Sequence, residues 1–211
     1  MSTLDAKAHW EERYGERDRV WSGRVNARLA EVAAGLPPGR ALDLGCGEGA
    51  DALWLAERGW QVVGVDISDT ALQRAAADAE KRGLSDRIEF RQADLPEQFP
   101  DGTFDLVSAQ FLHSTLPFDR TRVFQRAAEA IRPGGLLLIV DHGESPPWAS
   151  KLHHHHEFPS ADEVVASLNL PETQWERVRV ESAEREATGP DGQAGPLVDN
   201  IILLRRRVRG S

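Results

Sequence analysis

The stretch Ala41-Leu42-Asp43-Leu44-Gly45-Cys46-Gly47-Glu48-Gly49-Ala50 decides the fold. It begins with a short apolar run typical of a buried strand, and a helical pattern starts at Asp51 directly after the glycines. A glycine-rich turn between a strand and a helix lets a ligand come close to the backbone. It also fits the loose dinucleotide fingerprint, so the glycines alone predict an adenosine-containing cofactor without distinguishing NAD from another one.

Around this stretch, short apolar runs alternate with helical patterns. We expect strands over 41–44, 61–65, 88–92, 104–109 and 136–140, and helices over 51–58, 68–82 and 120–131, with a turn over 132–135. This alternation predicts an α/β fold in which helices cover both faces of a mostly parallel sheet. A capping box over 160–163 predicts a short helix to about residue 168, and strands over 175–187 and 197–207 predict an antiparallel C-terminal hairpin with its turn at 189–192.

The length of 211 residues fits a single domain. We expect an N-terminal helical lid and helix over 1–38, a cofactor-binding core over 39–142, and a substrate loop, short helix and hairpin over 143–211.

The composition limits the kinds of molecule that the protein is expected to bind. The formal net charge of −9 disfavours a general nucleic-acid or anionic-membrane surface. Cys46 is the one cysteine, so no internal disulfide forms. The sequence shows neither a signal peptide nor an apolar run long enough to span a membrane, and we expect a cytoplasmic protein with no membrane partner. The oligomeric state is not readable from the sequence.

Acidic residues lie at the ends of three successive predicted strands. Asp43 would repel a pyrophosphate but suits a cationic ligand. Asp66 follows Gly45 by about 20 residues, where a carboxylate accepts hydrogen bonds from ribose hydroxyls. As a strand-end carboxylate outside the core, Asp66 is expected to be dispensable for the fold. Asp94 is placed to accept from an adenine amino group. The series predicts a cationic, adenosine-containing ligand.

These motifs resemble, in order, those of class I S-adenosylmethionine-dependent methyltransferases. The first motif is matched by 42–49, the second by 65–68, the adenine motif by 92–95, the fourth strand by 104–107 and the turn before the fifth strand by 131–135. The resemblance implies a Rossmann-like seven-stranded sheet with its last strand inserted antiparallel, S-adenosyl-L-methionine as methyl donor and S-adenosyl-L-homocysteine as product. The strand from Trp175, the turn at 189–192 and the arginine-rich last strand more weakly resemble the tellurite-resistance methyltransferases.

The resemblance also implies how the cofactor sits. Gly45 and Gly47 would face its methionine part, the backbone near Gln110 would receive its amino group, and Ile67 and Leu95 would sandwich its adenine. The full set of residues predicted to bind the cofactor is Tyr14, Trp21, Asp43, Gly45, Cys46, Gly47, Asp66, Ile67, Ala93, Asp94, Leu95 and Gln110.

Aromatic residues precede the first strand in a charged, helical segment. We expect Tyr14 and Trp21 to cover the cofactor, where they would exclude water and attract a sulfonium through cation–π contacts. For Trp10 we expect a structural role, in which the ring fixes the helix to the sheet.

The candidate catalytic residues follow the fourth and fifth strands, where such sheets place the substrate. They are His113, Asp141 and His142, and a histidine suits a general base because its ordinary pKa is about 6.5. The alternative for His113 is packing against the next helix. The four histidines at 153–156 are consecutive and do not converge on one ion, so we predict no metal site.

The sequence therefore predicts in-line methyl transfer to a small-molecule acceptor, which is an oxygen, nitrogen or sulfur atom or a chalcogen oxyanion. Three alternatives stay open: a peptide or protein methyltransferase, an NAD-dependent oxidoreductase, and a non-catalytic cofactor-binding module. Asp43 is the feature that disfavours NAD.

Overall fold

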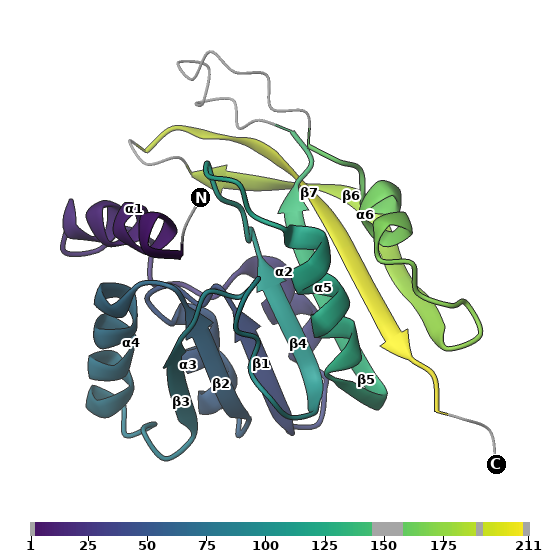
Figure 1. Ribbon diagram of the computed structural model, residues 1–211, viewed down its shortest axis with the longest axis horizontal. Coiled ribbons are helices and arrows are strands. Elements are labelled where there is room, and N and C mark those ends of the chain that lie inside the picture. The colour runs from purple at the N-terminus through teal and green to yellow at the C-terminus, as the bar shows by residue number, and fades with distance from the viewer. Residues whose placement is uncertain (1–2, 145–157, 189–191, 209–211) are drawn as a thin grey trace.

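One sheet of seven strands organises the chain, in the order β3-β2-β1-β4-β5-β7-β6 (Figure 1). The computed structural model describes residues 3–144, 158–188 and 192–208. The strands are β1 (Arg40–Leu44), β2 (Gln61–Asp66), β3 (Ile88–Gln92), β4 (Phe104–Gln110), β5 (Ile131–His142), β6 (Trp175–Thr188) and β7 (Ala194–Arg206). The helices are α1 (Thr3–Gly15), α2 (Ala27–Ala33), α3 (Ala50–Glu57), α4 (Asp69–Lys81), α5 (Arg120–Glu129) and α6 (Ala161–Ser167).

The pairing of the strands confirms the predicted fold class. Strands β1 to β5 run parallel, and β7 lies antiparallel between β5 and β6. The strand order reverses between β1 and β4. The strand that follows β1 in the sequence lies on one side of this pair, and the strand that follows β4 lies on the other side. A crevice forms at such a point, beyond the carboxyl ends of the strands.

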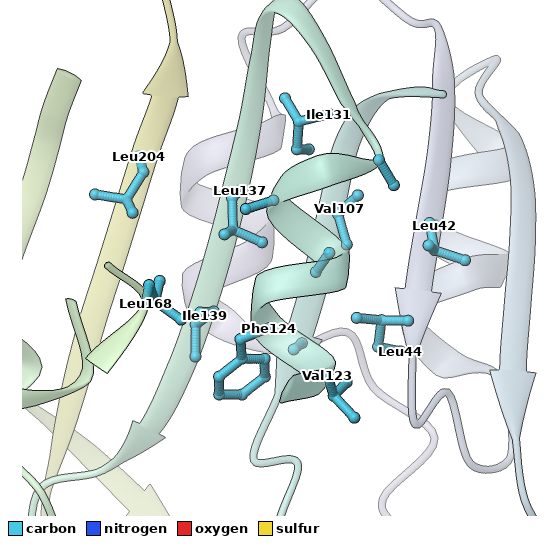
Figure 2. Close-up of a cluster of buried hydrophobic side chains, with 14 of the residues drawn as sticks. Leu42, Leu44, Val107, Val123, Phe124, Ile131, Leu137, Ile139, Leu168 and Leu204 are labelled. Atoms are coloured by element: carbon cyan, nitrogen blue, oxygen red, sulfur yellow. The ribbon is translucent and has the colours of Figure 1, made fainter. Parts of the chain in front are cut away.

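Two hydrophobic cores lie on opposite faces of the sheet. Helices α2 and α3, with Ala79 of α4, pack on one face, while α5 and α6 pack on the other. Figure 2 shows the second core, where Phe124 of α5 lies among Leu137, Ile139 and Val123. Both faces of β1, β4 and β5 are therefore buried, as expected for a parallel sheet.

Two predicted N-caps are present. The Ser68 side chain accepts a hydrogen bond from the backbone N–H of Ala71 at the start of α4. Ser160 and Glu163 form the complete capping box of α6. Short local signals therefore determine where these helices begin.

The expected start of the fifth strand is wrong. Strand β5 begins at Ile131, where the sequence favours a turn over 132–135, and α5 ends at Glu129. Ile131 pairs with Phe104, and the register shifts before Leu136 pairs with Leu106. Pairing with β4 thus extends the strand through residues whose proline and glycines favour a turn. The last strand also starts earlier than expected, at Ala194. The predicted turn at 189–192 lies mostly outside the described residues.

The N-terminal segment packs over the sheet edge near α4. Lys7 forms an ion pair with Asp69 at 2.6 Å. Glu11 accepts hydrogen bonds from the backbone N–H of Asp69 and the hydroxyl of Thr70, both at 2.5 Å. These contacts dock α1 at the start of α4 and place it above the carboxyl ends of the strands (Figure 1).

Replacing Phe124 tests the core under α5. Because its ring is buried, Phe124→Ala should lower the free energy of unfolding by about 3–5 kcal/mol. Val178→Ala on β6 is the control, since Val178 is exposed and its loss should change stability by at most about 0.5 kcal/mol. Urea unfolding followed by circular dichroism measures both. Equal stabilities of the two variants would contradict this description of the core.

Candidate functional site

A cavity of about 1120 Å³ opens at the carboxyl ends of β1, β2 and β4. All twelve residues predicted to bind the cofactor line it. Most of the remaining wall comes from α1, the segment over 20–26, residues 48–51 and the loop after β4, with smaller parts from residues 96–97 and Thr188. Residues far apart in the sequence therefore meet in one hollow, and their roles towards a ligand stay predictions.

The glycine-rich loop is held against β2. The backbone N–H groups of Gly45 and Cys46 both donate to the carbonyl of Val65, at 2.8 and 3.0 Å. Gly45 and Gly47 have φ values of 69° and 52°, in the left-handed region that glycine favours. A Cβ atom at Gly47 would lie 2.9 Å from the Tyr14 hydroxyl. Glycine is thus needed here both for the turn and for the approach of Tyr14.

Asp66 is part of this loop's support as well as of the cavity wall. One carboxylate oxygen accepts from the backbone N–H of Gly47 at 2.8 Å, and the other accepts from Ser68 at 3.0 Å. A carboxylate oxygen accepts more than one hydrogen bond, so both oxygens keep capacity for a ligand. The expectation that the fold does not need this carboxylate was too simple, because its burial and these two bonds give it a structural role.

Asp43 is a buried acid whose Oδ2 atom has no hydrogen-bond partner among the described residues. Burial raises the pKa of its carboxyl well above the ordinary value, and the nearby Asp51 and Asp66 raise it further. The buried Oε1 atom of Gln110, on the same cavity wall, also has no hydrogen-bond partner in the part of the chain that the structure describes. Buried acceptors without donors are rare in proteins. Their presence together indicates a ligand that brings donors or a positive charge.

Asp51 escaped the sequence analysis. It is the first acid of α3, and it accepts from the backbone N–H and the side-chain amide of Asn26, at 2.7 and 2.8 Å. This contact joins the N-cap of α2 to the first turn of α3, which directly follows the glycine loop. Only its place in the first turn of a predicted helix, directly after the glycines, could have signalled a role.

Glu48 is the second residue that the sequence analysis missed. It is buried within the glycine loop and accepts from the backbone N–H groups of Val20 and Trp21, each at 3.1 Å. Arg74 of α4 donates to Glu48 at 2.9 Å and to the carbonyl of Tyr14 at 2.9 Å. One buried carboxylate and one arginine therefore hold the N-terminal segment over the cavity.

The aromatic residues of this segment all line the cavity. Tyr14 is buried and accepts a hydrogen bond from Trp21 Nε1 at 3.0 Å, while Trp21 is half exposed. Burial is the main cause of a raised Tyr14 pKa, so the phenol stays neutral. Trp10, expected to be structural, also lines the cavity and lies 6.2 Å from the Tyr14 ring. The expectation for Trp10 was too narrow, because one face of α1 carries Trp10 and Tyr14 one turn apart.

The loop after β4 forms the other end of the cavity. Phe111 has a φ of 52°, which is strained for a bulky residue and typical of functional sites. Its backbone N–H donates to Val140 on β5, and its ring stacks on His142 with centroids 4.5 Å apart. This strained turn directs the following residues, Leu112 and His113, to the cavity wall.

Of the three candidate catalytic residues, His113 alone is among the described residues that line the cavity. Asp141 and His142 lie behind it at the end of β5. His113 Nε2 is 3.3 Å from Asp141 Oδ1, and the rings of His113 and His142 stack 5.8 Å apart. Burial, and then His113, lower the pKa of His142.

Two further features bear on the class of site. The described residues contain no cluster of three or more side chains able to hold a metal, while the histidines at 153–156 lie outside the described residues. No helix in the described part of the chain has the length and apolar character needed to cross a bilayer.

Removing the Glu48 carboxylate should release the N-terminal segment. In Glu48→Ala, the amides of Val20 and Trp21 lose a charged acceptor worth about 1.5–3 kcal/mol. We expect hydrogen exchange over residues 16–24 to speed up by about 10–100-fold. Exchange measured by mass spectrometry checks this, with Glu12→Ala as control because Glu12 is an exposed acid on α1. Unchanged exchange in Glu48→Ala would show that other contacts hold the segment.

Comparison with known proteins agrees with this geometry. Residues 41–135 match a family model described as a methyltransferase domain. The 27-O-demethylrifamycin SV methyltransferase of Amycolatopsis mediterranei (strain S699) is 40% identical over 135 residues, which cover 61% of this chain and 49% of that protein. The chain spans about half the length of the curated relatives that it matches.

Solved structures extend the likeness beyond the matched segment. A protein studied for the conversion of a disulfide bond into a thioacetal group during echinomycin biosynthesis has a TM-score of 0.73 and 26% identity, covering 97% of this chain and 93% of its own. TehB from Haemophilus influenzae has a TM-score of 0.70 and 20% identity, covers 93% of this chain and 67% of its own, and so shares the fold. Residues 41–135 therefore match a methyltransferase domain, and the chain has the fold of solved S-adenosylmethionine-dependent methyltransferases.

Proposed function

We propose that the chain transfers the methyl group of S-adenosylmethionine to a hydroxyl oxygen of a small molecule. The observation that carries the proposal is one continuous cavity with two unlike ends. The end at the glycine loop is lined by Asp43, Asp51 and Asp66. The end beyond β4 is lined mainly by apolar side chains, together with His113, Ser114 and Asp119.

The acidic end fits the methyl donor. A donor that carries an ammonium and a sulfonium supplies the charge that buried carboxylates require. Asp43 Oδ2 and Gln110 Oε1 are free to accept from its amino group. The remaining lone pairs of Asp66 suit ribose hydroxyls. A pyrophosphate would meet these same carboxylates and be repelled, which supports the methyl donor over NAD.

The N-terminal segment helps by excluding water. S-adenosylmethionine supplies an activated methyl on a cationic sulfur, so the protein's main task is alignment in a dry site. The Tyr14 hydroxyl and the edge of the Trp21 ring lie over the glycine loop, and aromatic rings near a cationic sulfur attract it. The contacts of Glu48 and Arg74 hold both rings in that position.

The other end suits a flat, largely apolar acceptor. Phe111, Leu112, Pro117 and Phe118 wall it, and Trp10 faces it from α1. His113 is the one histidine among the described lining residues. A neutral imidazole there is useful when the attacking atom carries a proton that must leave. The acceptor oxygen bonds to the methyl carbon, the bond from that carbon to sulfur breaks with its electron pair left on sulfur, and His113 takes the proton.

The names of similar proteins favour small molecules. The relative from Amycolatopsis acts, by its name, on an O-demethylated rifamycin. The structure from echinomycin biosynthesis concerns a disulfide, whose sulfur atoms carry no proton. A hydroxyl carries a proton that a base at the cavity wall can take up, so the position of His113 supports a hydroxyl as the acceptor in this chain.

Cofactor binding should depend on pH through Asp43. Its pKa is raised in the free protein, so the carboxyl is protonated over a wider pH range than usual, and a cationic ligand favours the ionised form. Binding therefore releases a proton, and affinity falls as pH falls through the raised pKa. We expect calorimetry with S-adenosylhomocysteine between about pH 5 and 8, in buffers of different ionisation enthalpy, to detect this release.

Asp43→Asn is the matched variant, because it keeps the shape of the side chain and removes the titration. Its affinity should be lower at pH 8, and its pH dependence should be flatter. NAD serves as the negative control and should bind poorly. Tight NAD binding without S-adenosylhomocysteine binding would refute the proposed function.

His113→Ala tests the acceptor end. If His113 is the base, turnover with a hydroxyl acceptor should fall by about 10²–10⁴-fold while S-adenosylhomocysteine affinity stays nearly constant. A radiolabelled-methyl screen against hydroxylated small molecules, followed to multiple turnovers, identifies an acceptor for the assay. His9→Ala is the control, since His9 contacts the same loop through Thr115 at 3.2 Å. Equal turnover in wild type and His113→Ala would return His113 to a packing role.

A further inference from the structure

We infer that Asp141 and Arg120 are positioning residues: Asp141 fixes the proton of the His113 ring on Nε2, Arg120 holds Asp141 in place, and Nδ1 is thereby left as the basic atom. This rests on the proposed function, because it describes the base at the acceptor end of that cavity. It changes the expected role of Asp141 from catalytic to positioning, and it adds Arg120, which the sequence analysis did not single out.

The position of the His113 ring carries the first step. Its Nε2 atom is buried and lies 3.3 Å from Asp141 Oδ1. The contact is not aligned as a full hydrogen bond, and Nε2 has no other partner among the described residues. Catalytic hydrogen bonds are often long in sites without ligand and shorten when substrate binds. A carboxylate beside Nε2 keeps the proton there, since it accepts and cannot donate.

Asp141 itself is a poor base. Its carboxylate is almost completely buried, and burial alone would raise its pKa. The contacts with His113 and Arg120 nevertheless hold the pKa of Asp141 below the ordinary value. An acid that stays ionised so readily takes up a proton weakly, but it stabilises a positive charge on the neighbouring ring. Asp141 is also not among the described residues that line the cavity.

Arg120 connects the carboxylate to the loop that carries His113. One terminal nitrogen donates to both oxygens of Asp141, at 2.5 and 2.6 Å. Its Nε donates to the carbonyl of Leu112, the residue directly before His113, at 2.9 Å. The guanidinium lies 5.1 Å from the centre of the Phe124 ring, which packs beneath it. A planar group with several fixed donors can hold both partners at once, whereas a lysine cannot.

Two uncharged rings also contact the His113 ring. His142 of β5 stacks on it at 5.8 Å, and burial lowers the pKa of His142, so this neighbour is neutral near pH 7. Phe158 meets the ring edge-on at 5.8 Å. Among the described residues, the charged groups that face the ring are thus Asp141 and, through it, Arg120. When the ring takes a proton from the acceptor, Asp141 stabilises the cation, and the proton afterwards leaves to solvent.

The decisive measurement is the tautomer of His113 in the full chain. Histidine rings labelled with ¹⁵N report which nitrogen carries the proton, and the His113 signals are identified by their loss in His113→Gln. We expect the Nε2–H form in the wild-type protein, both free and with S-adenosylhomocysteine. A neutral ring with its proton on Nδ1 would overturn the inference.

Asp141→Asn should reverse the tautomer. The amide can donate to Nε2, which moves the ring proton to Nδ1 and removes the basic lone pair. We expect turnover to fall by at least about tenfold, as when a histidine base loses its orienting carboxylate, with S-adenosylhomocysteine affinity within about twofold of wild type. Arg120→Met should also lower turnover, and Arg120→Lys should recover part of that loss. Arg122→Met is the control, because Arg122 is exposed on the same helix. Wild-type turnover and tautomer in Asp141→Asn would overturn the inference.

The wild-type tautomer decides the inference even if the Asp141 variant does not fold. It also separates this inference from the proposed function. An Nε2–H ring in a protein that methylates no hydroxyl acceptor would support the arrangement and refute the function. An Nδ1–H ring in an active methyltransferase would do the reverse.

Discussion

The cavity depends on the contact between the glycine loop and the end of β2. Val65 and Asp66 together accept three backbone hydrogen bonds from Gly45, Cys46 and Gly47. These bonds fix a loop that turns through left-handed conformations and open the crevice between β1 and β4. Tyr14, Glu48 and Asp51 are all placed relative to this loop. If it moved, both the acidic end of the cavity and the cover over it would be lost.

The three buried carboxylates of this cavity lower the stability of the folded protein. Asp43, Asp51 and Asp66 are buried close together, and burial raises the pKa of each. Charges of one sign in a low-dielectric interior destabilise a protein unless they are paired or protonated. Asp51 and Asp66 are partly compensated by backbone donors, whereas Asp43 retains an unpartnered oxygen. The uncompensated part is what a cationic ligand can stabilise, so binding and local stability are coupled.

Features that depend on local pattern and strand order could be predicted from the sequence. Short stretches of the chain are enough to predict the alternation of strands and helices and the residues at the strand ends. They also predict the helix caps at Ser68 and Ser160. Parallel strands bring their carboxyl ends to one edge of a sheet, which is why the sequence alone places Asp43, Asp66 and Asp94 together, and all three line the cavity.

The rest depends on contacts between distant elements. Glu48 meets Val20 and Arg74, about 26 residues away on either side, and no periodicity marks those partners. Arg120 looks like an ordinary first residue of a helix until Asp141 is seen beside it. The start of β5 was missed for the same reason: pairing with Phe104 outweighs the local preference of Pro133 for a turn.

The two ends of the cavity therefore differ in the structural elements that form them. The end proposed to bind the cofactor is formed by strand ends and a glycine loop, whose geometry the sheet itself imposes. The end proposed to bind the acceptor is formed by the loop after β4 with its strained turn at Phe111, which the sheet does not require. The residues of that loop belong neither to the strands nor to the glycine loop, which supports the proposal that they determine the choice of acceptor. Two contacts tie the loop after β4 back to β5: Arg120 joins the carbonyl of Leu112 to Asp141, and the backbone N–H of Phe111 donates to Val140.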